Sequence, residues 1–176
     1  AQLLLRSLRF AVERQHTLIT LRRLAMVDEL TGLYNERGFQ SLAEQQTRLA
    51  QRSRQSLAFF IVRLDSYCSI GEEFGAEAGE QALTLVGEAL RKSFRSSDIL
   101  ARRGEDTFMV LAINAPAASL SSIRSRLERH LSDANADSNL PYRLEVSSGV
   151  AHYEGGQELS LTSMIQQAER TLPALK

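Results

Sequence analysis

The chain has 176 residues, 43% of them hydrophobic, which is enough to bury one substantial core, so we expect one domain with an appendage. Its 21 basic and 21 acidic residues balance, so bulk charge does not indicate nucleic acid or an anionic membrane as a partner. A single cysteine, Cys68, excludes an internal disulfide and a cysteine-based zinc site. No apolar run is long enough to cross a membrane, and we expect a soluble, cytoplasmic piece of a longer protein.

The first 26 residues predict one long helix, since Gly and Pro are absent between Leu3 and about Met26. Apolar residues recur there at a spacing of about 3.5, as in a coiled coil. They are Leu4, Leu8, Ala11, Leu18, Leu21 and Ala25. We interpret residues 1–26 as a linker helix that pairs with its copy in a homodimer and carries a signal from upstream. The alternative is an amphipathic helix that packs on its own domain.

The next segment predicts a turn, a helix and a buried strand. Gly32 provides the turn, and Asn35 can cap a helix that runs to about Gln51. The run Ser56–Leu64 is apolar apart from Ser56 and Arg63, as expected of a central strand covered on both faces. A further helix is expected from about Ala76 to Phe94. Its predicted apolar face consists of Leu83, Val86, Leu90 and Phe94.

A β-hairpin is predicted next, with strands at Ile99–Arg103 and from Thr107 onward. Gly104 supplies the positive φ that its turn requires. Pro116 opens another helix, with an apolar stripe that includes Leu120, Ile123, Leu127 and Leu131 and with three arginines expected to face outward, Arg124, Arg126 and Arg129. A strand at Arg143–Tyr153 and a helix at Leu161–Leu172 complete an order that predicts an α/β sandwich with a central mixed sheet flanked by helices.

The segment that opens this domain resembles the diguanylate cyclase, or GGDEF, family, whose pattern there is D-x-L-T-G-L-x-N-x-R-x-F. The matching residues are Asp28, Leu30, Thr31, Gly32, Leu33, Asn35, Arg37 and Phe39. The hairpin tip resembles the five-residue GGDEF signature, and its first, third and last letters are kept. These positions hold Gly104, Glu105, Asp106, Thr107 and Phe108. The resemblance implies a palm-like nucleotidyl cyclase fold from about Leu24 to Lys176, with the degenerate GGDEF domain at residues 27–176.

Active members of that family join two GTP molecules with the help of magnesium, which carboxylates hold. At the matching positions around the metal and phosphates, this chain has Arg63 for the first metal-ligating Asp and Cys68 for a phosphate-contacting Lys. The two residues that read guanine in the family, an Asn and an Asp, are Gly71 and Glu80 here. In the hairpin, Glu105 replaces the second Gly and Thr107 replaces the catalytic Glu. Asp106 and Lys176 are kept. A guanidinium would repel magnesium, so we predict a vestigial nucleotide pocket with no bound magnesium and no catalytic residue.

A second motif of the family, Arg-x-x-Asp, is intact as Arg95 and Asp98. In the family this motif binds cyclic di-GMP, often with a further arginine from the following helix, which Arg126 matches here. Arginine can fork onto guanine or phosphate, and an ionised Asp accepts from guanine N–H groups. The alternative is an ordinary Arg95–Asp98 ion pair near a helix end.

The sequence therefore favours a non-catalytic GGDEF domain that binds cyclic di-GMP and regulates a larger bacterial signalling protein. One alternative is a ligand-free dimerisation domain that regulates a neighbour, such as a phosphodiesterase domain of the EAL type. Another is a residual cyclase that still makes cyclic di-GMP from GTP.

Overall fold

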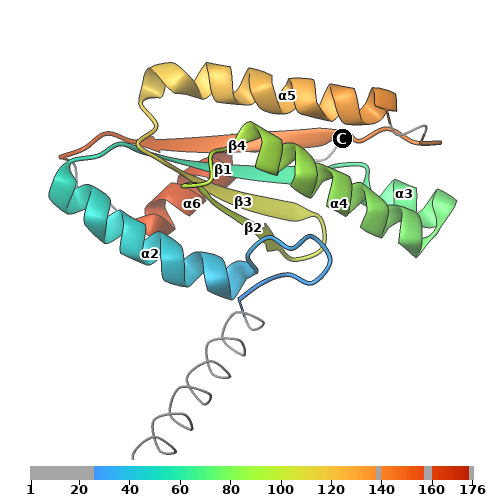
Figure 1. Ribbon diagram of the computed structural model, residues 1–176, viewed down its shortest axis with the longest axis horizontal. Helices are drawn as coiled ribbons and strands as arrows, with labels where there is room; N and C mark the ends of the chain where they lie inside the picture. The colour runs from blue at the N-terminus through green and yellow to red at the C-terminus, as the bar shows by residue number, and fades with distance from the viewer. Residues whose placement is uncertain (1–25, 138–139, 157–159, 175–176) are drawn as a thin grey trace, which may run out of the picture.

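The computed structural model describes residues 26–137, 140–156 and 160–174, and in this part of the chain a four-stranded sheet lies between two layers of helices (Figure 1). The strands are β1 (Leu57–Leu64), β2 (Ile99–Arg103), β3 (Thr107–Ile113) and β4 (Val146–Tyr153). The helices are α2 (Glu36–Ser53), α3 (Tyr67–Phe74), α4 (Ala76–Ser93), α5 (Leu120–Asp137) and α6 (Leu161–Thr171), with a 3₁₀ turn at Ala117–Ser119. The predicted helix over residues 1–26 lies outside the described residues, except for Met26.

The strand order is β2-β3-β1-β4, and each neighbouring pair is antiparallel. The predicted mixed sheet is therefore wrong for these four strands. β1 and β2 do run in the same direction, but β3 lies between them, and β1 lies in the same way between β3 and β4. Each strand-helix-strand unit is thus split by a strand from the other unit, as in ferredoxin-like folds.

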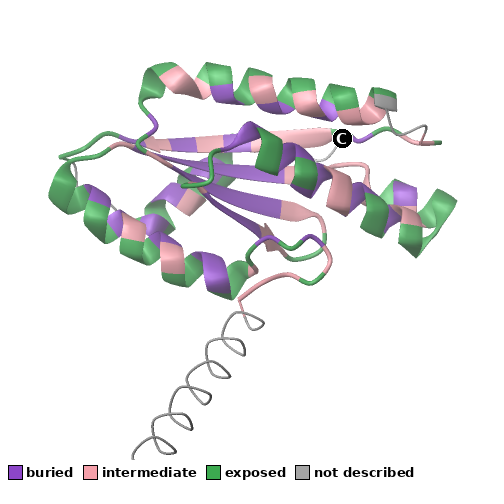
Figure 2. Ribbon diagram, viewed as in Figure 1, coloured by how far each residue is buried: buried purple, intermediate pink, exposed green. Residues whose placement is uncertain are grey.

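Strand β1 is covered on both faces, as its largely apolar sequence predicted. Ala58, Phe60 and Val62 pack in one core with α4 and α5, whereas Leu57, Phe59 and Ile61 pack in a second core with α2 and α6. Successive side chains of a strand point to opposite faces, so one run of apolar residues serves both cores. Figure 2 shows buried residues along the middle of the sheet and on the inward sides of the helices.

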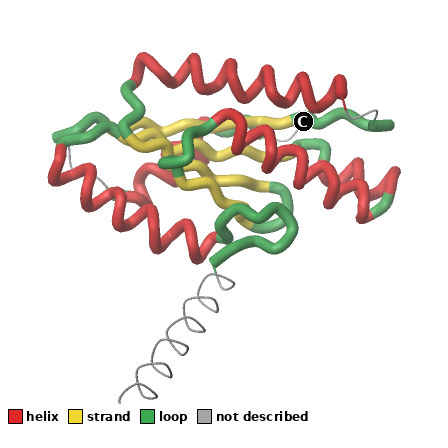
Figure 3. The backbone as a smooth tube through the Cα atoms, in the orientation of Figure 1, coloured by secondary structure: helices red, strands yellow, loops and turns green. Residues whose placement is uncertain are grey.

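Helix α2 begins where the sequence predicted. The side chain of Asn35 accepts a hydrogen bond from the backbone N–H of Gly38 at 2.9 Å, which satisfies one of the unpaired amides of the first turn. A Cβ on Gly38 would lie 2.4 Å from the carbonyl oxygen of Met26, so this glycine allows the preceding loop to approach the helix. The loop from Met26 to Asn35 is thereby held beside the sheet (Figure 3).

The hairpin of β2 and β3 is confirmed, and Gly104 at its tip has a φ of 64°. One residue of the loop before α2, Tyr34, pairs with the outer edge of β2. Tyr34 donates its N–H to the carbonyl of Leu100 at 3.0 Å, and its own carbonyl accepts from the N–H of Arg102 at 2.8 Å. This parallel bridge pairs part of a strand edge that would otherwise be open.

Two helical segments differ from the sequence expectation. The stretch after β1 forms a short helix of its own, α3, which Gly75 separates from α4 with a φ of 90°. Within α5, Ile123, Leu127 and Leu131 are buried as predicted, and Arg124 and Arg129 are exposed. Arg126, however, is half-buried and does not simply face outward, because it is bound to the end of α4.

Candidate functional site

The turn between α4 and β2 is fixed by the carboxylate of Asp98. Its Oδ2 accepts from the backbone N–H of Arg95 at 2.8 Å, and its Oδ1 accepts from the backbone N–H of Ile113 at 3.0 Å. The N–H of Asp98 donates in turn to the carbonyl of Arg95 at 3.0 Å. Asp98 therefore closes the turn by binding the backbone of Arg95, and it also connects the turn to the end of strand β3.

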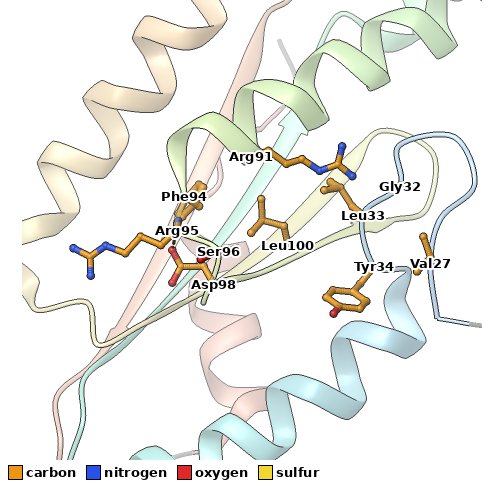
Figure 4. A pocket seen from close by; sticks show the side chains of 10 residues that line it. All are labelled: Val27, Gly32, Leu33, Tyr34, Arg91, Phe94, Arg95, Ser96, Asp98 and Leu100. Carbon is orange, nitrogen blue, oxygen red and sulfur yellow. Dashed lines mark hydrogen bonds between the residues drawn. The ribbon is translucent and has the colours of Figure 1, made fainter. Parts of the chain in front are cut away.

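The ordinary Arg95–Asp98 ion pair, the alternative raised by the sequence, is absent between these two described residues, whose contact runs through the backbone of Arg95. Figure 4 shows the guanidinium of Arg95 extending away from the Asp98 carboxylate and away from Tyr34, on the side of α5. Arg95 is exposed, so its guanidinium is available to an anion or a guanine edge.

Arg126 reaches the same turn from α5. Its Nε–H donates to the carbonyl of Ser93 at 2.6 Å, at the last residue of α4. The last carbonyls of a helix lack partners within the helix, and arginine is well suited to bind them. This bond explains why Arg126 is half-buried, and it fixes the plane of the guanidinium.

Arg95, Asp98 and Arg126 line one cavity of ≈ 190 Å³ between the turn, the end of β3 and the start of α5. Asn114, Ser119 and Ser122 add polar groups to its wall. The structure thus brings together the three residues that the sequence singled out as a cyclic di-GMP site. Their role as ligands stays a prediction.

A larger cavity of ≈ 490 Å³ lies on the other side of the same turn (Figure 4). The loop before α2, the end of α4 and the start of β2 form its walls, and Arg91 closes one side by donating from Nη2 to the carbonyl of Thr31 at 2.9 Å. Tyr34 presents its ring there with 38% of its surface exposed. Sequence reasoning missed this cavity, and the only signal was an aromatic residue in a motif read as architectural.

The predicted nucleotide pocket begins at the end of β1, where Arg63 pairs with Thr107 of β3 and Ser147 of β4. The Nε of Arg63 donates to Oδ1 of Asp65 at 2.9 Å, and its Nη2 donates to the carbonyl of Pro173 at 2.8 Å. Arg63 points to the sheet face that carries α6, because it lies two residues after Ile61 and so shares the face of that residue. Its guanidinium therefore lies between a carboxylate and the segment after α6.

The remaining residues of this pocket lie on the hairpin tip and on α3 and α4. Asp106 accepts from the hydroxyl of Thr107 at 2.8 Å, and its carbonyl accepts from the N–H of Leu64 at 2.9 Å, which joins the tip to β1. Glu105 is exposed, and its carbonyl accepts from Nη2 of Arg102 at 3.0 Å.

On the helical side of the pocket, Gly71 lies within α3, and a Cβ built there meets no atom within 4 Å. Glu80 on α4 is exposed. Lys176 lies outside the described residues.

Among the described residues, no group of three or more His, Cys, Asp or Glu side chains is arranged to hold a metal ion. The sequence-based expectation that no magnesium binds stays a prediction. In the same part of the chain, no helix is both long and apolar enough to cross a membrane.

A sequence profile described as "Diguanylate cyclase, GGDEF domain" matches residues 25–176. The chain belongs to the GGDEF family. The match covers most of the sequence and includes every described helix and strand.

Two curated relatives resemble this GGDEF domain in sequence. Diguanylate cyclase DgcP of Pseudomonas aeruginosa is 31% identical over 140 residues, which are 77% of this chain and 20% of that protein. Cyclic di-GMP phosphodiesterase NbdA of the same organism is 29% identical over 143 residues, 81% of this chain and 18% of that protein. The chain thus spans about a fifth of the length of each relative.

The coiled coil and GGDEF domain of DgcB from Caulobacter crescentus, solved in complex with cyclic di-GMP, is similar in structure. Its TM-score is 0.78 at 22% identity, and the alignment covers 94% of this chain and 88% of that one. This likeness confirms the cyclase-type α/β fold expected from the sequence, although the sheet between the helices is antiparallel and not mixed.

Proposed function

We propose that this GGDEF domain makes no cyclic di-GMP and instead binds it as a regulatory module, through Arg95, Asp98 and Arg126. The observation that carries the proposal is the contrast between two sites in one fold. The metal-ligand position at the end of β1 holds a guanidinium engaged in two hydrogen bonds, whereas the Arg95–Asp98 turn opens into a cavity that also contains Arg126.

The residues at the nucleotide pocket do not fit magnesium. Arg63 is cationic at any accessible pH, and at an effective dielectric of about 20 it would repel a divalent ion about 4 Å away by several kcal/mol. Its nearest carboxylate, Asp65, is already engaged by Arg63 and by the hydroxyl of Ser147. Thr107 stands where the resemblance implies a catalytic carboxylate, so the side chain that would serve catalysis is missing as well.

The base-reading side of the pocket is altered as well. Gly71 leaves open space where the resemblance implies an Asn side chain that reads guanine. Glu105 places a carboxylate on the tip that would face the polyphosphate, and like charges disfavour that approach. Gly71 and Glu105 act in addition to the charge of Arg63, so each of these three residues disfavours productive binding of GTP.

The chemistry of the Arg95 turn supports a dianionic guanine nucleotide as the ligand. Arg95 and Arg126 bring two guanidinium groups to one cavity in a chain without net charge. Both oxygens of Asp98 are held in place by backbone amides, yet each keeps a lone pair for a guanine N–H donor. Charge-assisted contacts of this kind are about twice as strong as neutral ones.

A ligand-free structural role is the second candidate, and one observation favours it. Asp98 already has a complete structural task in the empty site, because it holds the turn against β3. The intact motif is therefore expected in a domain that binds nothing at this position. Calorimetric titration with cyclic di-GMP separates the two candidates.

For the regulatory module, the expected outcome is binding in the micromolar range that is lost in Arg95→Ala. The exposed arginine side chain makes no hydrogen bond or ion pair with any described residue, so we expect the variant to retain its structure. A flat titration of the wild-type chain would favour the structural role. New cyclic dinucleotide after incubation with GTP and magnesium or manganese would overturn the proposed inactivity.

A further inference from the structure

We infer that the dinucleotide site continues from the Arg95 turn onto the exposed face of α5, where Ser122, Ser125 and Arg129 form a second phosphate subsite. This inference rests on the proposed binding of cyclic di-GMP and adds to it the residues that would hold the distal phosphate. It commits the site to a ligand with two phosphates.

The subsite is built by helical spacing. Ser122, Ser125, Arg126 and Arg129 are separated by three, four and seven residues, so they share one face of α5. Together they line an open depression of ≈ 470 Å³. Two hydroxyl groups and two guanidinium groups can all donate hydrogen bonds, which is the donor set that a phosphate diester requires.

The size of the first cavity indicates that a dinucleotide needs more room. Arg95 and Asp98 also line the ≈ 490 Å³ cavity beside Tyr34, but the cavity that they line together with Arg126 has only ≈ 190 Å³, below the range of about 300 to 1,000 Å³ typical of small-molecule sites. It can hold one part of a dinucleotide and not the whole. The depression on α5 adjoins it, because Ser122 and Arg126 line both.

The guanidinium of Arg126 can contact a ligand in both hollows, since Arg126 lines each of them. Its Nε is occupied by the carbonyl of Ser93, while its two terminal amino groups make no hydrogen bond with any described residue. A guanidinium fixed in this way can bridge two anionic groups without the loss of much side-chain entropy.

The charge of this face is positive although the chain as a whole is neutral. Arg95, Arg126 and Arg129 contribute three cations against the one carboxylate of Asp98, and no described ion pair neutralises any of the three. The acid that follows on the same face, Asp133, lies one turn beyond Arg129 and 3.9 Å from His130. The potential therefore favours an anion at the first half of α5.

The test compares two exposed arginines of α5 that line different hollows. Arg129→Ala and Arg124→Ala each remove one exposed cation from α5, but Arg124 lines a different hollow with Phe60 and Val150. We expect Arg129→Ala to weaken cyclic di-GMP binding about tenfold and to flatten its salt dependence. Arg124→Ala should change the affinity less than about twofold, and Arg129→Lys should restore part of the loss.

The outcomes separate this inference from the proposed function. If the wild-type chain binds cyclic di-GMP, Arg95→Ala abolishes binding and Arg129→Ala matches the wild type, the subsite is wrong while the proposed function stands. Equal losses in Arg124→Ala and Arg129→Ala would show a general charge effect and also overturn the subsite. A wild-type chain that binds no cyclic di-GMP would overturn both.

Discussion

Arg63 and Asp65 form an ion pair of 2.9 Å between Nε and Oδ1 at the end of β1, and their side chains are only 14% and 24% exposed. The guanidinium also donates to the carbonyl of Pro173, 110 residues further along the chain. At the position that the resemblance equates with a metal ligand, Arg63 is therefore an anchor that connects the central strand to the segment after α6.

This anchor should contribute measurably to stability. We expect Arg63→Ala to lower the free energy of unfolding by about 2 kcal/mol, because the half-buried carboxylate of Asp65 loses its cationic partner and the carbonyl of Pro173 loses its donor. Urea unfolding measures the change. Arg48→Ala is the control, since Arg48 lies 4.0 Å from Glu44 in an exposed pair and should cost less than about 0.5 kcal/mol. Equal effects in the two variants would contradict the anchoring role.

Reversal of the charge at this position should restore metal binding without restoring catalysis. Arg63→Asp places a carboxylate beside Asp65 and next to Leu64, whose N–H donates to the carbonyl of Asp106 at the hairpin tip. We therefore expect this variant to bind Mn²⁺ in a calorimetric titration. It should still form no cyclic dinucleotide from GTP, since Thr107 and Gly71 are unchanged. Arg124→Asp is the matched control and should bind no Mn²⁺. Saturable Mn²⁺ binding by the wild-type chain would refute this explanation.

Two glycines should respond to alanine in opposite directions. Gly71 lies inside α3 with open space around it, so Gly71→Ala should raise the free energy of unfolding by about 0.5 to 1 kcal/mol through helix propensity. A Cβ on Gly149 would lie 2.1 Å from the carbonyl oxygen of Ala168, so Gly149→Ala should cost about 2 kcal/mol or more by pushing α6 off β4. Urea unfolding of both variants checks the signs. A stable Gly149→Ala chain would show that α6 can shift at little cost.

Asp98 should matter to the fold even without ligand. Asp98→Ala removes the acceptor of two backbone amides, and we expect a loss of about 2 kcal/mol in the free energy of unfolding. Ser97→Ala, an exposed change in the same turn, should have an effect below about 0.5 kcal/mol. If Asp98→Ala unfolds like the wild type, the turn is held by other contacts. Arg95→Ala is therefore the cleaner probe of binding.

The elements that local chemistry defines could be predicted from the sequence. The cap at Asn35, the hairpin turn at Gly104 and the doubly covered strand β1 depend on residues that are close together in the chain. The antiparallel order of the sheet could not be predicted in this way. It depends on which strand inserts between two others, and the length of a connection does not specify that choice.

In the candidate sites, too, the residues of a local motif could be predicted, whereas contacts between distant parts of the chain could not. The motif identified Arg95 and Asp98, and the structure places Arg126 beside them, but no sequence pattern indicated that Arg126 binds the end of α4. The bond from Arg63 to Pro173 was hidden for the same reason, since it joins residues far apart in the chain. The cavity beside Tyr34 arises from packing between a loop, a helix end and a strand, which no single segment encodes.

The bridge between Tyr34 and β2 restricts how copies of this domain can associate. Because the carbonyl of Leu100 and the N–H of Arg102 are already bonded to Tyr34, another chain cannot add a strand at that point without displacing the loop before α2. Continuation of the sheet by a second copy is therefore blocked at the middle of β2, on the edge that lies beyond β3.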